Sequence, residues 1–199
     1  MKALLLDSAM NFICKYHSYS ELDKKKLRYG LEGIYLTITK MIILVILSCI
    51  LGIFEEFICV TLLFNIIRYT GFGFHAEKSY QCLLFSTFNF IVIPYIFLHI
   101  ELSYIAIYVV CGICILHYLL FAPADTKKRP LPNKKKRIIR KIITVMIGII
   151  YTLIIIFINN QYWTGIILSS LIIQAIVISP LTYRLFNQPY NNYKMLNTK

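Results

Sequence analysis

Charged side chains are scarce in this sequence. Asp, Glu, Lys and Arg account for 15% of its 199 residues, whereas a soluble domain carries about 25%. None of them occurs in five long apolar stretches: 41–54, 82–98, 104–122, 142–158 and 164–183. Most of these stretches approach the roughly 20 apolar residues that an α-helix needs to cross the hydrocarbon layer. The distribution excludes a sizeable soluble domain and predicts an all-α, polytopic membrane protein.

Acidic side chains are scarcer than basic ones, nine against 21, which gives a net charge of +12. Nine of the Lys and Arg residues lie between positions 127 and 141. Positive charge clustered beside membrane helices follows the positive-inside rule and attracts anionic lipid headgroups. Nucleic-acid binding would require a basic face with exposed aromatic residues on a soluble unit. We therefore expect lipid headgroups, and not nucleic acid, at a basic cytoplasmic loop over residues 122–141.

The N-terminus lacks the features of a signal peptide, because only four apolar residues separate Lys2 from Asp7 and no clear cleavage site follows. Apolar residues recur there with helical spacing up to Tyr16. This pattern is typical of an amphipathic helix that lies on the membrane surface. We expect residues 1–30 to form interfacial helices at the inner leaflet.

The number of crossings follows from placing the N-terminus, the basic loop and the C-terminus in the cytoplasm. Three apolar stretches lie between the N-terminal region and the loop, so an even number of crossings requires a fourth. The candidate is 57–67, whose eleven residues would rise only about 17 Å as a helix. We expect it to cross together with less regular backbone directly after it, or where neighbouring helices thin the barrier. We expect Glu55 and Glu56 to lie outside.

The predicted architecture is a single helical membrane domain over residues 1–199, with about six transmembrane helices and an N-terminal amphipathic helix. It is a multi-pass protein of the cell membrane with both termini in the cytoplasm. Residues 68–82 lie at the cytoplasmic interface, and residues 186–199 form a mobile polar tail.

Six cysteines show no disulfide framework, and four of them lie inside apolar stretches, where a free cysteine behaves as a small hydrophobe. Cys111, Cys114 and His117 follow one another along one expected helix, but their neighbours are apolar and no fourth ligand is evident. This arrangement indicates packing in preference to metal binding. We expect neither a metal nor another cofactor.

The stretch RYTGFGFHAEKSYQC, residues 68–82, is the exception among the apolar segments. A histidine can convert a nearby cysteine into a nucleophilic thiolate. On one continuous helix His75 and Cys82 would lie about 10.5 Å apart along the axis, which is too far for proton transfer. Gly71 and Gly73 permit a break in the backbone that folds the histidine back.

A helix beginning near residue 76 or 77 would then carry Cys82 in its second turn, where the macrodipole stabilises a thiolate. Arg68 could add positive potential or hold a substrate carboxylate. The alternative is a structural turn with an interfacial histidine and a cysteine in the core.

Together these features resemble the accessory gene regulator protein B (AgrB) family, the membrane peptidases of Gram-positive quorum sensing. The resemblance covers essentially the whole chain. It rests on the length near 200, the amphipathic start, Arg68, the His-x6-Cys spacing in GFGFHAEKSYQC, and the segment APADTKKRPLPNKKKR at 122–137.

The resemblance implies a cysteine endopeptidase with Cys82 as nucleophile, His75 as general base, and Arg68 and Gly73 in support. Its substrate would be a short amphipathic propeptide of the AgrD kind. A thioester acyl-enzyme would form as the C-terminal part leaves, and ring closure would give a thiolactone or lactone. A homodimer is left open. The alternative is a non-enzymatic small transporter or peptide-export partner, in which the histidine and cysteine only shape a cavity.

Overall fold

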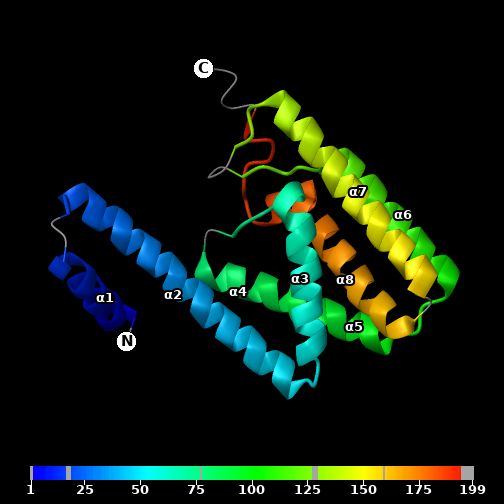
Figure 1. Cartoon of the computed structure of the whole chain (residues 1–199), viewed down its shortest axis with the longest axis horizontal. Coiled ribbons are helices and arrows are strands. Elements are labelled where there is room, and N and C mark those ends of the chain that lie inside the picture. The colour runs from blue at the N-terminus through cyan, green and yellow to red at the C-terminus, as the bar shows by residue number, and fades with distance from the viewer. Residues whose placement is uncertain (1, 17–18, 77, 127–129, 159, 194–199) are drawn as a thin grey trace. The chain divides into compact units, whose positions relative to one another are not determined.

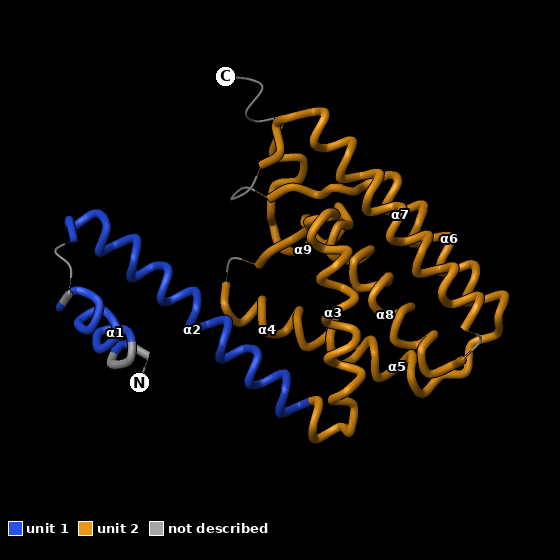
Figure 2. The backbone as a smooth tube through the Cα atoms, in the orientation of Figure 1, with its two compact units in different colours: residues 1–47 blue, residues 48–199 orange. Residues whose placement is uncertain are grey.

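The computed structural model describes residues 2–16, 19–76, 78–126, 130–158 and 160–193. Within these ranges the chain forms helices, and an isolated parallel bridge pairs Phe72 with Ala124. The predicted all-α fold is therefore confirmed. The chain divides into two compact units, Met1–Leu47 and Ser48–Lys199 (Figure 2).

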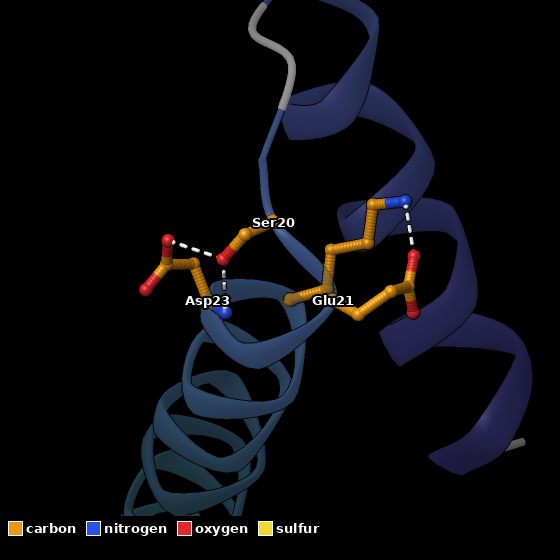
Figure 3. Close-up of polar contacts among 4 residues, drawn as sticks. Ser20, Glu21 and Asp23 are labelled. Atoms are coloured by element: carbon orange, nitrogen blue, oxygen red, sulfur yellow. Dashed lines mark hydrogen bonds and ion pairs between the residues drawn. The ribbon is translucent and has the colours of Figure 1, made fainter.

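The first unit contains α1 (Lys2–Tyr16) and most of α2 (Glu21–Ile50). A capping interaction begins α2, because the Ser20 hydroxyl accepts a hydrogen bond from the Asp23 N–H at 3.2 Å and donates to its carboxylate at 2.7 Å (Figure 3). The predicted N-terminal helix is present as α1. Residues 21–30, which we expected to be interfacial, continue without a break into the first apolar stretch.

In the part of the chain that the structure describes, five helical segments are long and apolar enough to cross a membrane. They are α2, the combined segment Ser79–His99, α6 (Tyr104–Phe121), α7 (Lys134–Ile158) and α8 (Gln161–Ile178). Their positions agree with the five apolar stretches in the sequence, which supports a multi-pass membrane protein.

The helix observed around 57–67 is longer and more regular than expected, and its crossing of the membrane stays a prediction. The structure has an 18-residue helix, α3 (Phe54–Gly71), which spans about 27 Å at 1.5 Å per residue. Glu55 and Glu56 belong to its first turn, where the positive end of the helix dipole stabilises acidic side chains. Regular α-helix therefore extends beyond residues 57–67 at both ends.

A π-helical turn interrupts the segment Ser79–His99. It separates α4 (Ser79–Thr87) from α5 (Ile93–His99) and covers Phe88–Val92. Pro94 lacks an N–H, and its ring clashes with the carbonyl four residues earlier, so the wider turn accommodates the proline. The segment continues through this turn as one helical rod (Figure 1).

Helix α8 forms the centre of the second unit, where α3, α5, α6 and α7 all contact it (Figure 1). The buried Tyr118 hydroxyl donates to the Leu171 carbonyl at 2.6 Å and so joins α6 to α8. Gly148 of α7 leaves room for that ring, because an added Cβ would lie 3.0 Å from it. Residues 68–82 are therefore attached to a closely packed helix bundle.

Candidate active site

The candidate site lies at one end of the helix bundle. There α3 ends, α6 ends, α7 begins and α8 ends. Two contacts join α3 to α7: the Thr144 hydroxyl donates to that of Thr70 at 2.9 Å, and the Arg140 guanidinium donates to the Tyr69 carbonyl at 3.0 Å. The last turn of α3 is thus held firmly before the glycine segment begins.

The glycines break the helix as predicted. Helix α3 ends at Gly71, after which Phe72 adopts φ = 54° and Gly73 adopts φ = 128°. A Cβ on Gly73 would lie 2.6 Å from Val177 Cγ1 and 2.8 Å from Arg68 Nη1. Both the backbone angle and the crowding therefore demand glycine at position 73.

Backbone hydrogen bonds hold this turn against two distant segments. The Ala124 N–H donates to the Gly71 carbonyl at 3.0 Å, within an isolated parallel bridge between Phe72 and Ala124. The Phe74 N–H donates to the Val177 carbonyl at 2.8 Å. The turn is therefore fixed between the segment after α6 and the end of α8.

Arg68 folds back over the turn that comes directly after its own helix. Its guanidinium donates to three successive carbonyl oxygens, those of Phe72 at 3.3 Å, Gly73 at 3.3 Å and Phe74 at 2.7 Å. Protein surrounds the guanidinium, although the residue as a whole is partly exposed. Arg68 therefore has a structural role, because the N–H donors of its guanidinium organise the turn.

The charge of Arg68 also bears on the predicted nucleophile. Both Cys82 and Tyr183 lie close enough to interact electrostatically with the guanidinium. A positive neighbour favours the thiolate over the thiol. Arg68 therefore lies near Cys82, and its support of the nucleophile stays a prediction.

Cys82 lies in the first turn of α4 and is half-buried. The predicted helix start near residue 76 or 77 was wrong, because α4 begins at Ser79. The Cys82 N–H donates to the Lys78 carbonyl at 3.0 Å, the first hydrogen bond of the helix. The sulfur is consequently nearer the positive end of the helix dipole than we expected.

His75 is exposed on irregular backbone directly after Phe74. The buried Phe74 ring meets Phe85 of α4 edge to face, with 5.4 Å between ring centroids. Phe85 follows Cys82 by three residues and so lies on nearly the same face of the helix. The structure thus packs the histidine segment against the cysteine helix, and a His75–Cys82 dyad stays a prediction. Glu77, between the two, lies outside the described residues.

The sequence analysis missed Gln174, a fully buried residue of α8. Its amide nitrogen donates to the Phe72 carbonyl at 3.1 Å across 102 positions of sequence. Gly71 makes this approach possible, because a Cβ there would lie 2.5 Å from the same nitrogen. A polar amide in an otherwise apolar stretch was the available signal, since buried polar groups in membrane helices are costly.

The C-x-x-C pair lies on α6, and the basic loop follows that helix. Cys111 and Cys114 are buried in α6. Nowhere in the described ranges do three or more His, Cys, Asp or Glu side chains come together as metal ligands would. The second half of the basic loop is helical, because α7 begins at Lys134.

Comparison with known proteins identifies the family. The accessory gene regulator B family profile matches residues 6–178. An AgrB-like protein of Listeria innocua serovar 6a is 33% identical over 172 residues, which cover 85% of this chain and 83% of that protein. An AgrB-like protein of Clostridium acetobutylicum is 31% identical over 181 residues, covering 90% and 86%. Accessory gene regulator protein B of Staphylococcus aureus is 24% identical over 180 residues, covering 89% and 94%.

No solved structure matches the chain. The family profile nevertheless covers the first turn of α4, the turn at residues 71–74 (the glycine turn) and α8, which together form the candidate site. This chain belongs to the accessory gene regulator B family.

Proposed function

We propose that this protein is a membrane-embedded cysteine endopeptidase that cuts an autoinducer propeptide and promotes its cyclisation. Family membership supports a role in accessory gene regulator quorum sensing. The observation that carries the proposal is the packing of the glycine turn onto α4. Phe74, the neighbour of His75, contacts Phe85 three residues after Cys82.

In the proposed reaction His75 takes the thiol proton of Cys82, and the thiolate attacks the scissile carbonyl carbon of the propeptide. The C–N bond breaks, and His75 returns the proton to the leaving amine of the C-terminal part. The remaining peptide is held as a thioester on Cys82. An internal cysteine or serine of the peptide then gives its proton to His75 and attacks the thioester, so the ring closes and the Cys82 thiolate leaves.

The interfacial location suits this chemistry. A thioester retains acyl-transfer potential, and a partly dry pocket would slow its hydrolysis before the ring closes. A short amphipathic propeptide of the AgrD kind would lie on the same surface as the enzyme, which raises its effective concentration. The exposed Lys134, Lys135 and Lys136 at the start of α7 suit anionic lipid headgroups. We place this end of the bundle, and both termini, in the cytoplasm.

The direct test compares wild type with Cys82→Ser and His75→Ala in liposomes that contain the propeptide encoded beside this chain. Cleavage should fall by at least about a thousandfold in both variants, because each removes a reacting group. Mass spectrometry should detect a thioester adduct on Cys82 of the wild type. Cys49→Ser, which changes an exposed cysteine outside the site, is the matched control and should cut normally. Equal cleavage by folded wild type, Cys82→Ser and His75→Ala would favour the transporter alternative.

A smaller effect is expected for Gln174→Leu, which keeps the side-chain volume but removes the donor to the Phe72 carbonyl. Loss of one hydrogen bond should lower cleavage about three- to tenfold through a less populated turn. The rate per folded molecule measures this effect. Gln161→Leu, at the exposed start of the same helix, should leave the rate unchanged. A normal rate for Gln174→Leu would show that the arginine and the backbone hydrogen bonds maintain the turn without this amide.

A further inference from the structure

The C-terminal segment differs from the mobile tail expected for residues 186–199. Residues 194–199 lie outside the described residues, but 186–193 pack against the segment after α6 and against the glycine turn. The family profile ends at residue 178. These contacts are therefore made by a part of the chain beyond the matched region.

Asp125 holds the segment in place. Its side chain is buried, and its two oxygens accept hydrogen bonds from the backbone N–H groups of Asn192 at 3.0 Å, Tyr193 at 2.8 Å and Leu131 at 3.3 Å. A buried carboxylate is tolerated only when it is satisfied in this way. The Arg137 guanidinium covers the Tyr193 ring, 3.2 Å from its centroid. The end of the described chain is thus clamped from two sides.

Two tyrosines extend the clamp toward the glycine turn. The buried Tyr183 hydroxyl donates to the carbonyls of Ala124 at 3.2 Å and Asp125 at 3.1 Å. Burial, and then the Asp125 carboxylate, raise the pKa of Tyr190 to about 12, so its hydroxyl stays protonated. That hydroxyl donates to the Phe121 carbonyl at 3.4 Å. The rings of the two tyrosines meet edge to face at 5.1 Å.

Phe186 contacts both halves of the candidate site. Its ring stacks on Phe74 with 4.6 Å between centroids and a 24° angle between planes. The same ring meets Phe85 of α4 edge to face at 5.3 Å. Phe186 thus touches the neighbour of His75 on one side and the helix of Cys82 on the other.

We infer that the segment 186–193, held by Asp125, forms a wall of the active site in which Phe186 positions the His75 turn against the Cys82 helix. The inference rests on the proposed function. Phe186 contacts Phe74 and Phe85, and Asp125 binds the backbone of the segment, so both act as positioning residues. If the segment were displaced, His75 and Cys82 would both remain, but their relative positions would be less well defined. Such a change lowers kcat more than it weakens substrate binding.

Two truncations test the wall as a whole. A chain ending at Leu185 removes the segment from Phe186 onward, whereas a chain ending at Tyr193 keeps every described contact. Propeptide cleavage in liposomes should show kcat per folded molecule at least about tenfold lower for the shorter chain, with KM within about threefold of wild type. The chain ending at Tyr193 should match wild type. Equal kcat for both truncations would overturn the inference.

Point variants test the positioning residues separately. Phe186→Leu loses the ring contacts and should lower kcat at least about fivefold, whereas Phe186→Tyr keeps the ring and should restore it. Leu185→Ala, at an exposed neighbour, is the control. Asp125→Asn keeps nearly the same side-chain shape, but its NH2 group replaces an oxygen that accepts a hydrogen bond from a backbone N–H. Two donors then face each other, so kcat should fall about as far as in Phe186→Leu. Loss of folded protein with an unchanged kcat per molecule would indicate structural support only.

A second readout separates this inference from the proposed reaction. The rate at which a bulky maleimide modifies Cys82, mapped by mass spectrometry, needs no substrate. It should rise at least about threefold in the chain ending at Leu185, because removing the segment that packs on α4 makes the half-buried Cys82 more accessible. If wild type never cuts the propeptide, the proposed function fails, yet this rise would still support the wall. An unchanged maleimide rate would overturn the wall even if cleavage is normal in wild type.

Discussion

Gly73→Ala should lose about a hundredfold of propeptide cleavage while the rest of the helix bundle stays folded. Gly73 adopts φ = 128°, a region that residues with a Cβ rarely enter. The added Cβ would lie 2.6 Å from Val177 Cγ1, 2.8 Å from Arg68 Nη1 and 2.9 Å from the Val177 carbonyl oxygen. Since one of these contacts is backbone, a side-chain rotation alone cannot relieve the crowding.

The turn must therefore move, and the bond from the Phe74 N–H to the Val177 carbonyl is the first to break. Backbone strain of about 1–3 kcal/mol and a lost hydrogen bond of about 1 kcal/mol together account for a loss of this size. Cleavage per folded molecule, with circular dichroism as the check on folding, measures it.

Gly112→Ala is the matched control for this variant. Gly112 lies inside α6, and nothing lies within 4 Å of the position that its Cβ would take. Alanine in a helix interior is slightly more stable than glycine, so cleavage should be unchanged. Wild-type cleavage by Gly73→Ala would mean that the turn is flexible and that its geometry does not control the reaction.

The sequence was sufficient to predict the helices that are apolar throughout. Five long uncharged stretches correspond to the five apolar segments in the structure. The break at Gly71 to Gly73 was predicted, but the predicted reason holds only for Gly73, which has a positive φ. Gly71 is the last residue of α3, and Phe72 adopts the other positive φ. Both predictions depend on local composition and conformation, which one sequence reveals directly.

Helix α3 is longer than the expected 57–67 because charged residues were taken as its limits. Glu55 and Glu56 occupy the first turn, where the helix dipole favours them. Arg68 occupies the last turn and directs its guanidinium to the carbonyls of the glycine turn. At both ends a local electrostatic contact satisfies the charge, so the helix extends through it.

The contacts that complete the site are long-range and leave little trace in the sequence. Gln174 lies 102 positions from its acceptor Phe72, and Asn192 lies 67 positions from Asp125. A polar tail such as 186–193 is ordinarily mobile. In this protein the buried Asp125 carboxylate accepts hydrogen bonds from backbone N–H groups of the tail. Such contacts involve the backbone, so a pattern of residue types does not specify them.

Arg68→Lys is expected to lower kcat at least about thirtyfold even though the charge is retained. The two terminal nitrogens of the arginine reach three successive carbonyls, at Phe72, Gly73 and Phe74. A lysine carries its donors on one nitrogen and cannot span these acceptors in the same way. At least one carbonyl would lose its donor, and the turn that carries His75 would lose its defined geometry.

Arg68→Met separates the charge from the hydrogen bonds. It removes both the donors and the positive potential at Cys82, so its kcat should fall further than that of Arg68→Lys, by at least about a hundredfold. The control is Arg184→Lys, at an exposed position of α9 (Pro180–Leu185), which should retain the wild-type rate. If Arg68→Lys cuts as fast as wild type while Arg68→Met does not, the charge alone acts on Cys82, and the three carbonyl contacts are not required to hold the turn. If both lose turnover in the expected order, this arginine serves the reaction in two ways, because one guanidinium both organises the histidine turn and favours the thiolate.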